Sequence, residues 1–367
     1  MNVIESIKRF KKFILISDIH FGVHSDSIEW VDNIKQYFRN FFIPTIKNID
    51  DNDVAVIIAG DVFDNRQKLD ISVMCAAQEI FNEILSINSN ICVFAITGNH
   101  DLYRKNKSNE KTITSLNCIC HDRFYIIDDV LKCQLNNGQK ILFVPWQDTR
   151  EIETEIVKKA DADIIIMHTD INGGIYDNGR EIVNGVNIDV TNAKKIYSGH
   201  IHMRQESPRR IYLGSPYHTN RSDIGNEKGL YILSILDNEI NESFIVNDYS
   251  PKYIKITYNE YNEYNDDELA NVIRNNYVDF IIDESDLNKI KMSDILNRVE
   301  KLDYKKFEVV VNKNSHEIKY ETASNQNITI DAHIKNYINT LDELTDEDRT
   351  ILSKMNDAYF NIIQQEI

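Results

Sequence analysis

Short apolar runs rich in β-branched residues recur through the first two thirds of the chain and alternate with segments of helical periodicity. Runs of this length and composition predict buried β-strands, and their alternation with helices predicts an α/β layer architecture. In 30–41 and 73–84 the apolar residues recur at helical spacing, as in helices that pack on a sheet. The predicted strands are 13–17, 54–59, 91–96, 141–144, 163–167, 195–197, 211–213 and 230–235.

Five of these runs lead directly into groups of Asp, Asn and His residues. Ligands of open α/β sheets bind at the carboxyl ends of the strands, so we expect the five groups to meet at one site. One such residue alone is typical of a turn, a helix N-cap or a satisfied core histidine, whereas five groups in succession favour a metal site. The groups are Asp18-Ile19-His20, Gly60-Asp61, Gly98-Asn99-His100-Asp101, His168 and Gly199-His200-Ile201-His202.

The residue types indicate the kind of metal centre. Carboxylates, an amide oxygen and imidazoles, without a thiolate, suit divalent ions such as Mn²⁺, Fe²⁺ or Zn²⁺. The groups offer more ligands than one tetrahedral ion needs, whereas two ions bridged by a carboxylate would use them all. Such ion pairs hold both the attacking and the leaving oxygen of an in-line phosphoryl displacement. The predicted reaction is therefore phosphoester hydrolysis.

Taken together, these motifs resemble the complete motif set of the calcineurin-like metallophosphoesterases, over the stretch 12–236. Ser-Asp-Ile-His-Phe-Gly at 17–22, Gly-Asp-Val-Phe-Asp at 60–64 and Gly-His-Ile-His at 199–202 are similar to the SbcD-type DNA repair nucleases. The tract 212–223 is most similar to the phage recombination endonuclease small subunits of that group. The resemblance implies a two-sheet β-sandwich flanked by helices, and a DNA exonuclease and endonuclease that works in an SbcCD-like recombination and repair complex.

The resemblance also implies two divalent ions as cofactors, with Mn²⁺ the expected metal. The implied ligands of one ion are Asp18, His20, Asp61 and His202, and those of the other are the bridging Asp61, Asn99, His168 and His200. His168 has no flanking signature of its own. Asp170, two positions further on, is open to two interpretations, as a group that supports the ligands or as a loop residue.

Two further residues are implied to be catalytic. His100 would face the scissile phosphate, where it would stabilise developing charge or protonate the leaving 3′ oxygen. Asp101 would hold the tautomer of His100 and raise its pKa. His24, His121 and His218 are expected to be surface or supporting residues.

The distribution of glycine and proline predicts the domain organisation. No glycine follows Gly229 and no proline follows Pro251, which places a boundary near 248–252. We expect a nuclease domain at 1–248, an α/β capping domain at 249–325 and a helical segment at 326–367. In the second region, 253–258 and 307–311 are predicted strands, and 269–277 and 293–301 are predicted helices.

The apolar stripe of the last segment has two possible uses. It packs within its own chain, or it binds the coiled coil of an SbcC-like ATPase, as the resemblance implies. The resemblance further implies a homodimer formed through helices of the nuclease core. The five cysteines are scattered, without a Cys-x-x-Cys pair, and no apolar run approaches the roughly 18 residues of a membrane helix. The chain is therefore expected to be cytoplasmic, in the host cytoplasm if it is phage-encoded, and without a membrane partner.

The net charge first argues against DNA. Lys and Arg number 41 against 58 Asp and Glu, a balance of −17, whereas phosphate contacts need basic surface. However, 14 basic and 23 acidic residues lie in 252–367, so that region carries −9 of the total. DNA therefore stays the expected partner and substrate. The alternative substrate is a nucleotide or another small phosphoester. A third hypothesis is a non-catalytic scaffold that keeps the fold. Basic residues beside the motifs would contact phosphates or are simply solvated: Arg66, Lys68, Arg104, Lys105, Lys107, Lys111, Arg204, Arg209 and Arg210.

Overall fold

A computed structural model describes residues 2–49, 53–103, 113–236, 239–312 and 349. The chain divides into two units, 1–312 and 313–367. The predicted segment 326–367 therefore lies, apart from Arg349, outside the described residues. The predicted boundaries near 248 and 325 stay predictions.

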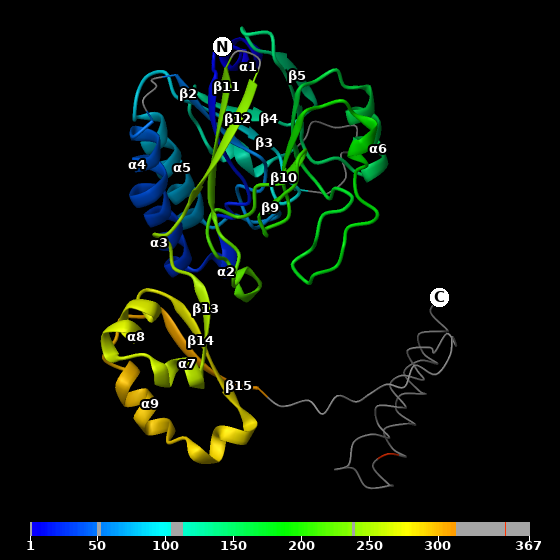
Figure 1. Ribbon diagram of the computed structural model, residues 1–367. Coiled ribbons are helices and arrows are strands. Elements are labelled where there is room, and N and C mark those ends of the chain that lie inside the picture. Colours follow the sequence, from blue (N-terminus) through cyan, green and yellow to red (C-terminus); the bar gives the residue numbers. More distant parts are fainter. Residues whose placement is uncertain (1, 50–52, 104–112, 237–238, 313–348, 350–367) are drawn as a thin grey trace, which may run out of the picture. The chain divides into compact units, whose positions relative to one another are not determined.

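Two six-stranded mixed sheets form the body of the first unit (Figure 1). In the first sheet, β1 to β4 are parallel and β11 runs antiparallel to β1. Its order is β12 (Glu239–Val246), β11 (Gly229–Leu236), β1 (Lys12–Ile16), β2 (Val54–Ile58), β3 (Cys92–Ile96) and β4 (Phe124–Ile127). The order of the second is β5 (Leu131–Gln134), β6 (Lys140–Val144), β7 (Ile164–His168), β8 (Lys195–Gly199), β10 (Arg210–Tyr212) and β9 (Gln205–Glu206).

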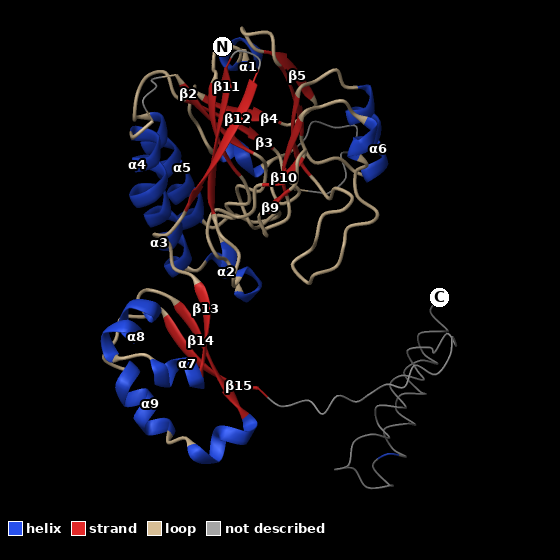
Figure 2. Ribbon diagram, viewed as in Figure 1, coloured by secondary structure: helices blue, strands red, loops and turns tan. Residues whose placement is uncertain are grey.

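Side-chain alternation along the strands builds the layers. Phe13 and Leu15 of β1 enter a core that joins both sheets, whereas Ile14 and Ile16 enter the core beneath the helices. Both faces of β1 are thus buried, which explains why its sequence is apolar throughout. Helices α3 (Ile28–Tyr37), α4 (Ile43–Lys47) and α5 (Ile71–Leu85) cover the first sheet, and α6 (Arg150–Lys159) covers the second (Figure 2). The predicted α/β two-sheet sandwich with flanking helices is confirmed.

Every predicted strand of this body is present, but four strands were not predicted. β4, β5 and β9 are only two to four residues long. β12 is an edge strand in which exposed and half-buried residues alternate, so it lacks the apolar run of a central strand. Short helical elements complete the body: α1 (Val3–Ile7), α2 (Val23–Asp26), a π-helix (Phe38–Phe42) and 3₁₀ turns at Ser115–Cys118, Ile188–Val190 and Arg221–Asp223.

A third, smaller sheet follows at 253–312. Its parallel strands are β13 (Tyr253–Thr257), β14 (Tyr277–Asp283) and β15 (Lys306–Asn312), and its helical elements are α7 (Tyr258–Glu263), α8 (Asp266–Ile273), a 3₁₀ turn (Glu284–Lys289) and α9 (Met292–Val299). This region has a hydrophobic core of its own, as an α/β region should. The predicted helix 269–277 is wrong at its end, because Asn275 has a φ of 58° and Tyr277 already begins β14.

Two smaller predictions concern cysteine and membranes. All five cysteines are free thiols, as expected. Within the described ranges, none of the helices combines the length and the apolar character that crossing a bilayer would take.

Candidate metal centre

The carboxyl ends of five strands bring the predicted ligands together. Asp18 and His20 follow β1, Asp61 follows β2, Asn99 follows β3, His168 ends β7, and His200 and His202 follow β8. Strands β1, β2 and β3 are neighbours in one sheet, and β7 and β8 are neighbours in the other. All seven predicted ligands therefore lie at one site, where the strand ends of both sheets meet.

Four of the seven ligands have a positive φ angle, which is unusual for residues other than glycine. The φ angles of Asp18, His20, Asp61 and His200 are 53°, 51°, 53° and 82°, in the left-handed region that costs a non-glycine residue roughly 1–2 kcal/mol. Backbone bonds between the loops enforce this geometry, since the N–H of Asp18 donates to the carbonyl of Gly60 and that of His20 to the carbonyl of Asp61. Strain held in this way is typical of functional sites.

Close approach of the loops also needs glycine at one position. A Cβ at Gly98 would collide with Oδ1 and the backbone nitrogen of Asp61. The absent side chain lets the β2 and β3 loops touch. Asp61 Oδ1 then accepts the backbone N–H of His100 at 2.8 Å, which leaves Oδ2 facing the histidines.

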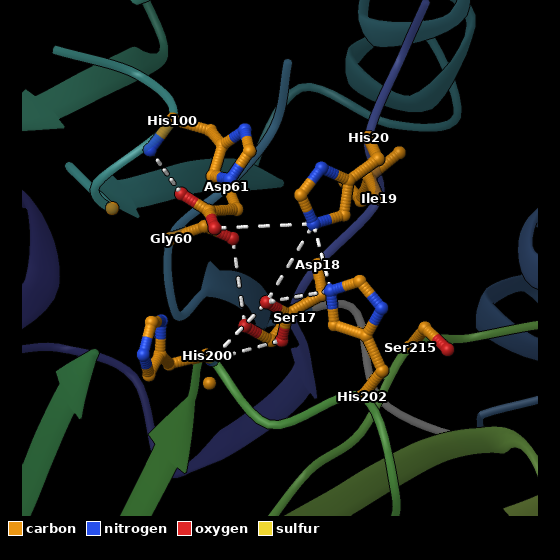
Figure 3. Close-up of polar contacts among 12 residues, drawn as sticks. Ser17, Asp18, Ile19, His20, Gly60, Asp61, His100, His200, His202 and Ser215 are labelled. Atoms are coloured by element: carbon orange, nitrogen blue, oxygen red, sulfur yellow. Dashed lines mark hydrogen bonds and ion pairs between the residues drawn. The ribbon is translucent and has the colours of Figure 1, made fainter. Parts of the chain in front are cut away.

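The first ligand group consists of Asp18, His20 and His202 (Figure 3). Nε2 of His20 lies 3.0 Å from Nε2 of His202, and Asp18 Oδ1 is 3.9 Å from each. Nδ1 of His20 faces Oδ1 of Asp64 at 3.1 Å. The contact is not an aligned hydrogen bond, but because a carboxylate only accepts, it favours the tautomer of His20 with its hydrogen on Nδ1 and the lone pair of Nε2 directed into the group.

The second group consists of Asp61, His168 and His200, joined by Asn99. His168 donates from Nδ1 to the carbonyl of Ala59 at 2.7 Å, so its Nε2 carries the lone pair in the neutral ring. That Nε2 faces Asp61 Oδ2 at 3.1 Å and Asn99 Oδ1 at 3.0 Å. Asp61 Oδ2 also lies 3.8 Å from Nε2 of His20, so this carboxylate links the two groups.

The donor atoms fit divalent cations. In both groups nitrogen and oxygen atoms that can act as metal ligands converge, and protons or cations between them would stabilise the arrangement. Burial alone would lower the pKa of His168, but Asp61 raises it to about 9. Burial would also lower the pKa of His20, which Asp64, Asp61 and Asp18 raise instead. The site therefore favours positive charge, and its nitrogen and oxygen donors match Mn²⁺, Fe²⁺ or Zn²⁺.

Asp101 does not make the predicted contact with His100. Its carboxylate accepts the backbone N–H groups of Asp61, Val62, Phe63 and Gly98 at 2.8–3.2 Å. These bonds occupy both oxygens, so Asp101 holds the β2 loop in place and does not orient His100. The sequence showed the carboxylate beside His100 but not the direction in which it points.

A residue without a predicted role, Asp64, holds His100 instead. Nδ1 of His100 lies 2.5 Å from the backbone carbonyl of Asp64, so Nδ1 carries the hydrogen. Burial lowers the pKa of His100, the reverse of the predicted shift. Asp64 therefore holds two histidines, His20 through its carboxylate and His100 through its carbonyl. Its signal in the sequence was the last residue of the Gly-Asp-Val-Phe-Asp motif.

Three of the basic residues that were predicted to contact phosphates already pair with groups of the fold. Arg204 pairs with Glu206 and Glu227, Arg209 donates to the carbonyls of Ala193, Ile188 and Thr191, and Arg210 donates to the carbonyl of Asn172. These three arginines stabilise their own loops, and a phosphate-binding role for them stays a prediction. Arg66 lies near enough to His100 to contribute to its lowered pKa. The cluster from Arg104 to Lys111 is outside the described residues.

Comparison with known proteins gives a family and a phage relative. The model of the calcineurin-like phosphoesterase family matches residues 11–204. The chain is also 26% identical, over 364 residues, to exonuclease subunit 1 of Enterobacteria phage T4, an alignment that covers 93% of this chain and 96% of that protein.

Solved structures give weaker likenesses. A candidate 5′-nucleotidase from Staphylococcus aureus, solved in complex with α-ketoglutarate, is 14% identical with a TM-score of 0.34. The match covers 65% of this chain and 54% of that one, so the chain spans about half the length of that structure. A protein of unknown function from Aquifex aeolicus is 18% identical with a TM-score of 0.25, over 49% of this chain and 93% of that one.

Proposed function

The chain belongs to the calcineurin-like phosphoesterase family and is a metal-dependent phosphoesterase, and from that premise we propose that it is a DNA nuclease that uses two metal ions. The observation that carries the proposal is the position of Asp61 between two groups of metal-type ligands, with His100 beside them. The ring of His100 lies 5.0 Å from that of His20, centroid to centroid, and packs edge to face with it.

The metal ions would neutralise the phosphate charge and supply a water of lowered pKa as the nucleophile. Asp18, His20, Asp61 and His202 would hold one ion, and Asp61, Asn99, His168 and His200 the other. We expect Mn²⁺, because none of these proposed ligands is a thiolate and because carboxylate, amide and imidazole donors suit this ion.

His100 would act on the substrate itself. Its Nδ1 hydrogen bond to the Asp64 carbonyl fixes the ring and leaves Nε2 to exchange a proton with an oxygen of the phosphodiester. The lowered pKa makes His100 a neutral imidazole in the free protein near neutral pH. A bound phosphodiester anion would raise that pKa, so His100 would gain its proton as substrate binds and release it to the leaving 3′ oxygen.

DNA is the favoured substrate because the phage relative is named an exonuclease subunit and its similarity extends over nearly the whole chain. A family member that acts only on small phosphoesters does not need the additional region 253–312. Binding would rest on backbone phosphates and hence depend on salt. The free thiols are consistent with a cytoplasmic location.

The proposed partners are a second copy of the chain and a coiled-coil ATPase. At the N-terminal ends of the neighbouring helices α3 and α5, Ile28, Ile71 and Met74 are 74%, 77% and 36% exposed. Exposed apolar side chains on adjacent helices suit a dimer interface. The ATPase contact is proposed for residues 326–367, which the structure does not describe, and would place the enzyme in an SbcCD-like repair and recombination complex.

A nuclease assay tests the proposal. We expect the purified protein to degrade linear duplex DNA with Mn²⁺ and to lose roughly 10²–10⁴-fold in kcat in the variant His100→Ala, the usual worth of a positioned acid or base. His121→Ala, which alters a histidine away from the strand ends, should match wild type. Hydrolysis of a small chromogenic phosphodiester without any DNA cleavage, even with the ATPase added, would favour the alternative substrate class.

A further inference from the structure

A carboxylate stands behind His200, on the far side of its ring from the proposed metal ions. Asp170 follows the strand β7 by two residues, and its Oδ1 lies 3.4 Å from Nε2 of His200. The other ring nitrogen, Nδ1, lies 2.9 Å from Asn99 Oδ1 and faces the second ligand group. His200 is thus held between the amide oxygen of Asn99 and a carboxylate.

We propose that Asp170 is a positioning residue for the second metal ion, acting through His200. With a cation bound at Nδ1, the hydrogen of the neutral ring is on Nε2, where the carboxylate of Asp170 would accept it. The same contact fixes the rotation of the ring. This inference rests on the two-metal centre proposed above but does not depend on DNA as the substrate.

Hydrogen bonds hold the backbone on both sides of Asp170. The N–H of Val186 donates to the carbonyl of Asp170 at 2.8 Å, and the N–H of Ile171 donates to the hydroxyl of Tyr212 at 2.6 Å. Tyr176 lies near enough to the carboxylate of Asp170 that its own pKa is raised and that of Asp170 is lowered in part by their interaction. The main chain at Asp170 is therefore held by contacts that do not involve His200.

One oxygen of this carboxylate still lacks a full partner. Asp170 Oδ1 is buried, and no hydrogen bond of ordinary length reaches it from the described residues. Leaving a buried carboxylate oxygen unsatisfied costs free energy, which a closer approach of His200 would recover. Nε2 of His200, 3.4 Å away, is a ring nitrogen that can donate a hydrogen to it.

The neighbouring ligand shows what Asp170 adds. His168 is fixed by the main-chain carbonyl of Ala59, which no substitution of a side chain removes. Among the residues that the structure describes, no main-chain group bonds to Nε2 of His200, whose side chain is 21% exposed, whereas the side chain of His168 is fully buried. Of the two histidines in this group, His200 is therefore the one that a side chain rather than the main chain supports at the nitrogen remote from the group.

Titration of the metal-free protein with Mn²⁺ by isothermal calorimetry tests this inference. We expect wild type to bind two ions and Asp170→Asn to bind one of them 10–100-fold more weakly, the usual effect of removing such a support. Asp189→Asn removes an exposed carboxylate from the same segment between β7 and β8 and should leave both affinities unchanged. Thermal unfolding of the metal-free variants would verify that each is folded.

A double-variant cycle separates positioning from a general structural effect. In the background His200→Ala, the change Asp170→Asn should have little further effect, because no ring remains to orient. Equal weakening in both backgrounds, or wild-type affinity for both ions in Asp170→Asn, would overturn the inference. Wild-type protein that binds no Mn²⁺ would instead overturn the two-metal proposal, and this inference with it.

A spectroscopic measurement on the unaltered protein guards against a variant that fails to fold. In Zn²⁺-loaded wild type, the ring ¹⁵N resonances of His200, assigned by their absence in His200→Ala, should report a hydrogen on Nε2. A hydrogen on Nδ1 would contradict the proposed role of Asp170.

Discussion

The two ligand groups of the metal centre are supported in different ways. In the first group, the side chain of Asp64 holds His20, and the Nζ of Lys228 donates to the carbonyl of His202 at 2.6 Å. In the second group, the main-chain carbonyl of Ala59 holds His168, and the side chain of Asp170 faces His200. Within the second group, substitutions nearby should therefore act mainly through His200, because His168 is held by the fold itself.

Asp61 is shared by both groups, so replacing it should weaken metal binding in both of them. Asp61→Asn keeps the shape and tolerates the positive φ of this position but removes the charge between the histidines. We expect phosphodiesterase activity to fall by roughly 10³-fold or more, since the bridging charge serves both ions. Calorimetry should show both Mn²⁺ affinities reduced, and loss of only one would mean that Asp61 does not bridge.

Lys228 supports only the first group. Its side chain is 1% exposed and pairs with Asp223 at 2.5 Å, which is 2% exposed. Lys228→Met would leave a buried carboxylate unpaired, so we expect the free energy of unfolding to fall by about 3–5 kcal/mol. Urea denaturation measures this loss, and the added change Asp223→Asn should recover part of it. If Lys228→Met lost less than about 1 kcal/mol, the pair would not hold the His202 loop.

Asp64 is the counterpart of Asp170 on the first side. Asp64→Asn weakens the hold on Nδ1 of His20 but keeps the main-chain carbonyl that binds His100. We expect one Mn²⁺ affinity to fall by roughly 10-fold, with the proton transfer of His100 preserved. Combining Asp64→Asn with Asp170→Asn should weaken both ions. If the two variants weaken the same ion, the assignment of one carboxylate to each side is wrong.

Acid should lower the free energy of unfolding through His218, a buried histidine in the surroundings of the first group. Burial lowers the pKa of this histidine to about 4, and its Nδ1 accepts the N–H of Tyr253. Below pH 6.5 the unfolded chain binds a proton that the folded chain does not, so stability falls from pH 6.5 toward pH 4. Between pH 7.5 and 5.0, wild type should lose about 2 kcal/mol more than His218→Gln in urea denaturation. An equal loss in both proteins would assign the acid sensitivity to other groups.

Much of this site could be read from the order of residues along the chain. Central strands buried on both faces must be apolar, and polar residues directly after them must lie at the strand ends, as Asp18 and Asp61 do. The edge strand β12 and the short β4 carry no such pattern and were missed. The end of α8 was misplaced because the change from helix to strand at Tyr277 follows a turn that local periodicity does not mark.

Side-chain direction could not be read in the same way. Asp101 is adjacent to His100 in the chain, yet it turns away to accept four N–H groups, while the carbonyl of the distant Asp64 takes the place predicted for it. Likewise Arg209 follows a ligand motif but donates to carbonyls of its own fold. These choices depend on which unpaired backbone groups lie within reach, and that is settled only when loops from different strands meet.

The amino-acid sequence by itself thus determined which strands are followed by polar groups, which donor atoms those groups offer and which family the chain resembles. All three depend on residue type and spacing. The tertiary structure alone decided which carboxylates support which histidines. Asp64 and Asp170 lie 44 and 30 residues from the rings they face, and only the packing of two sheets brings those atoms within about 3.5 Å.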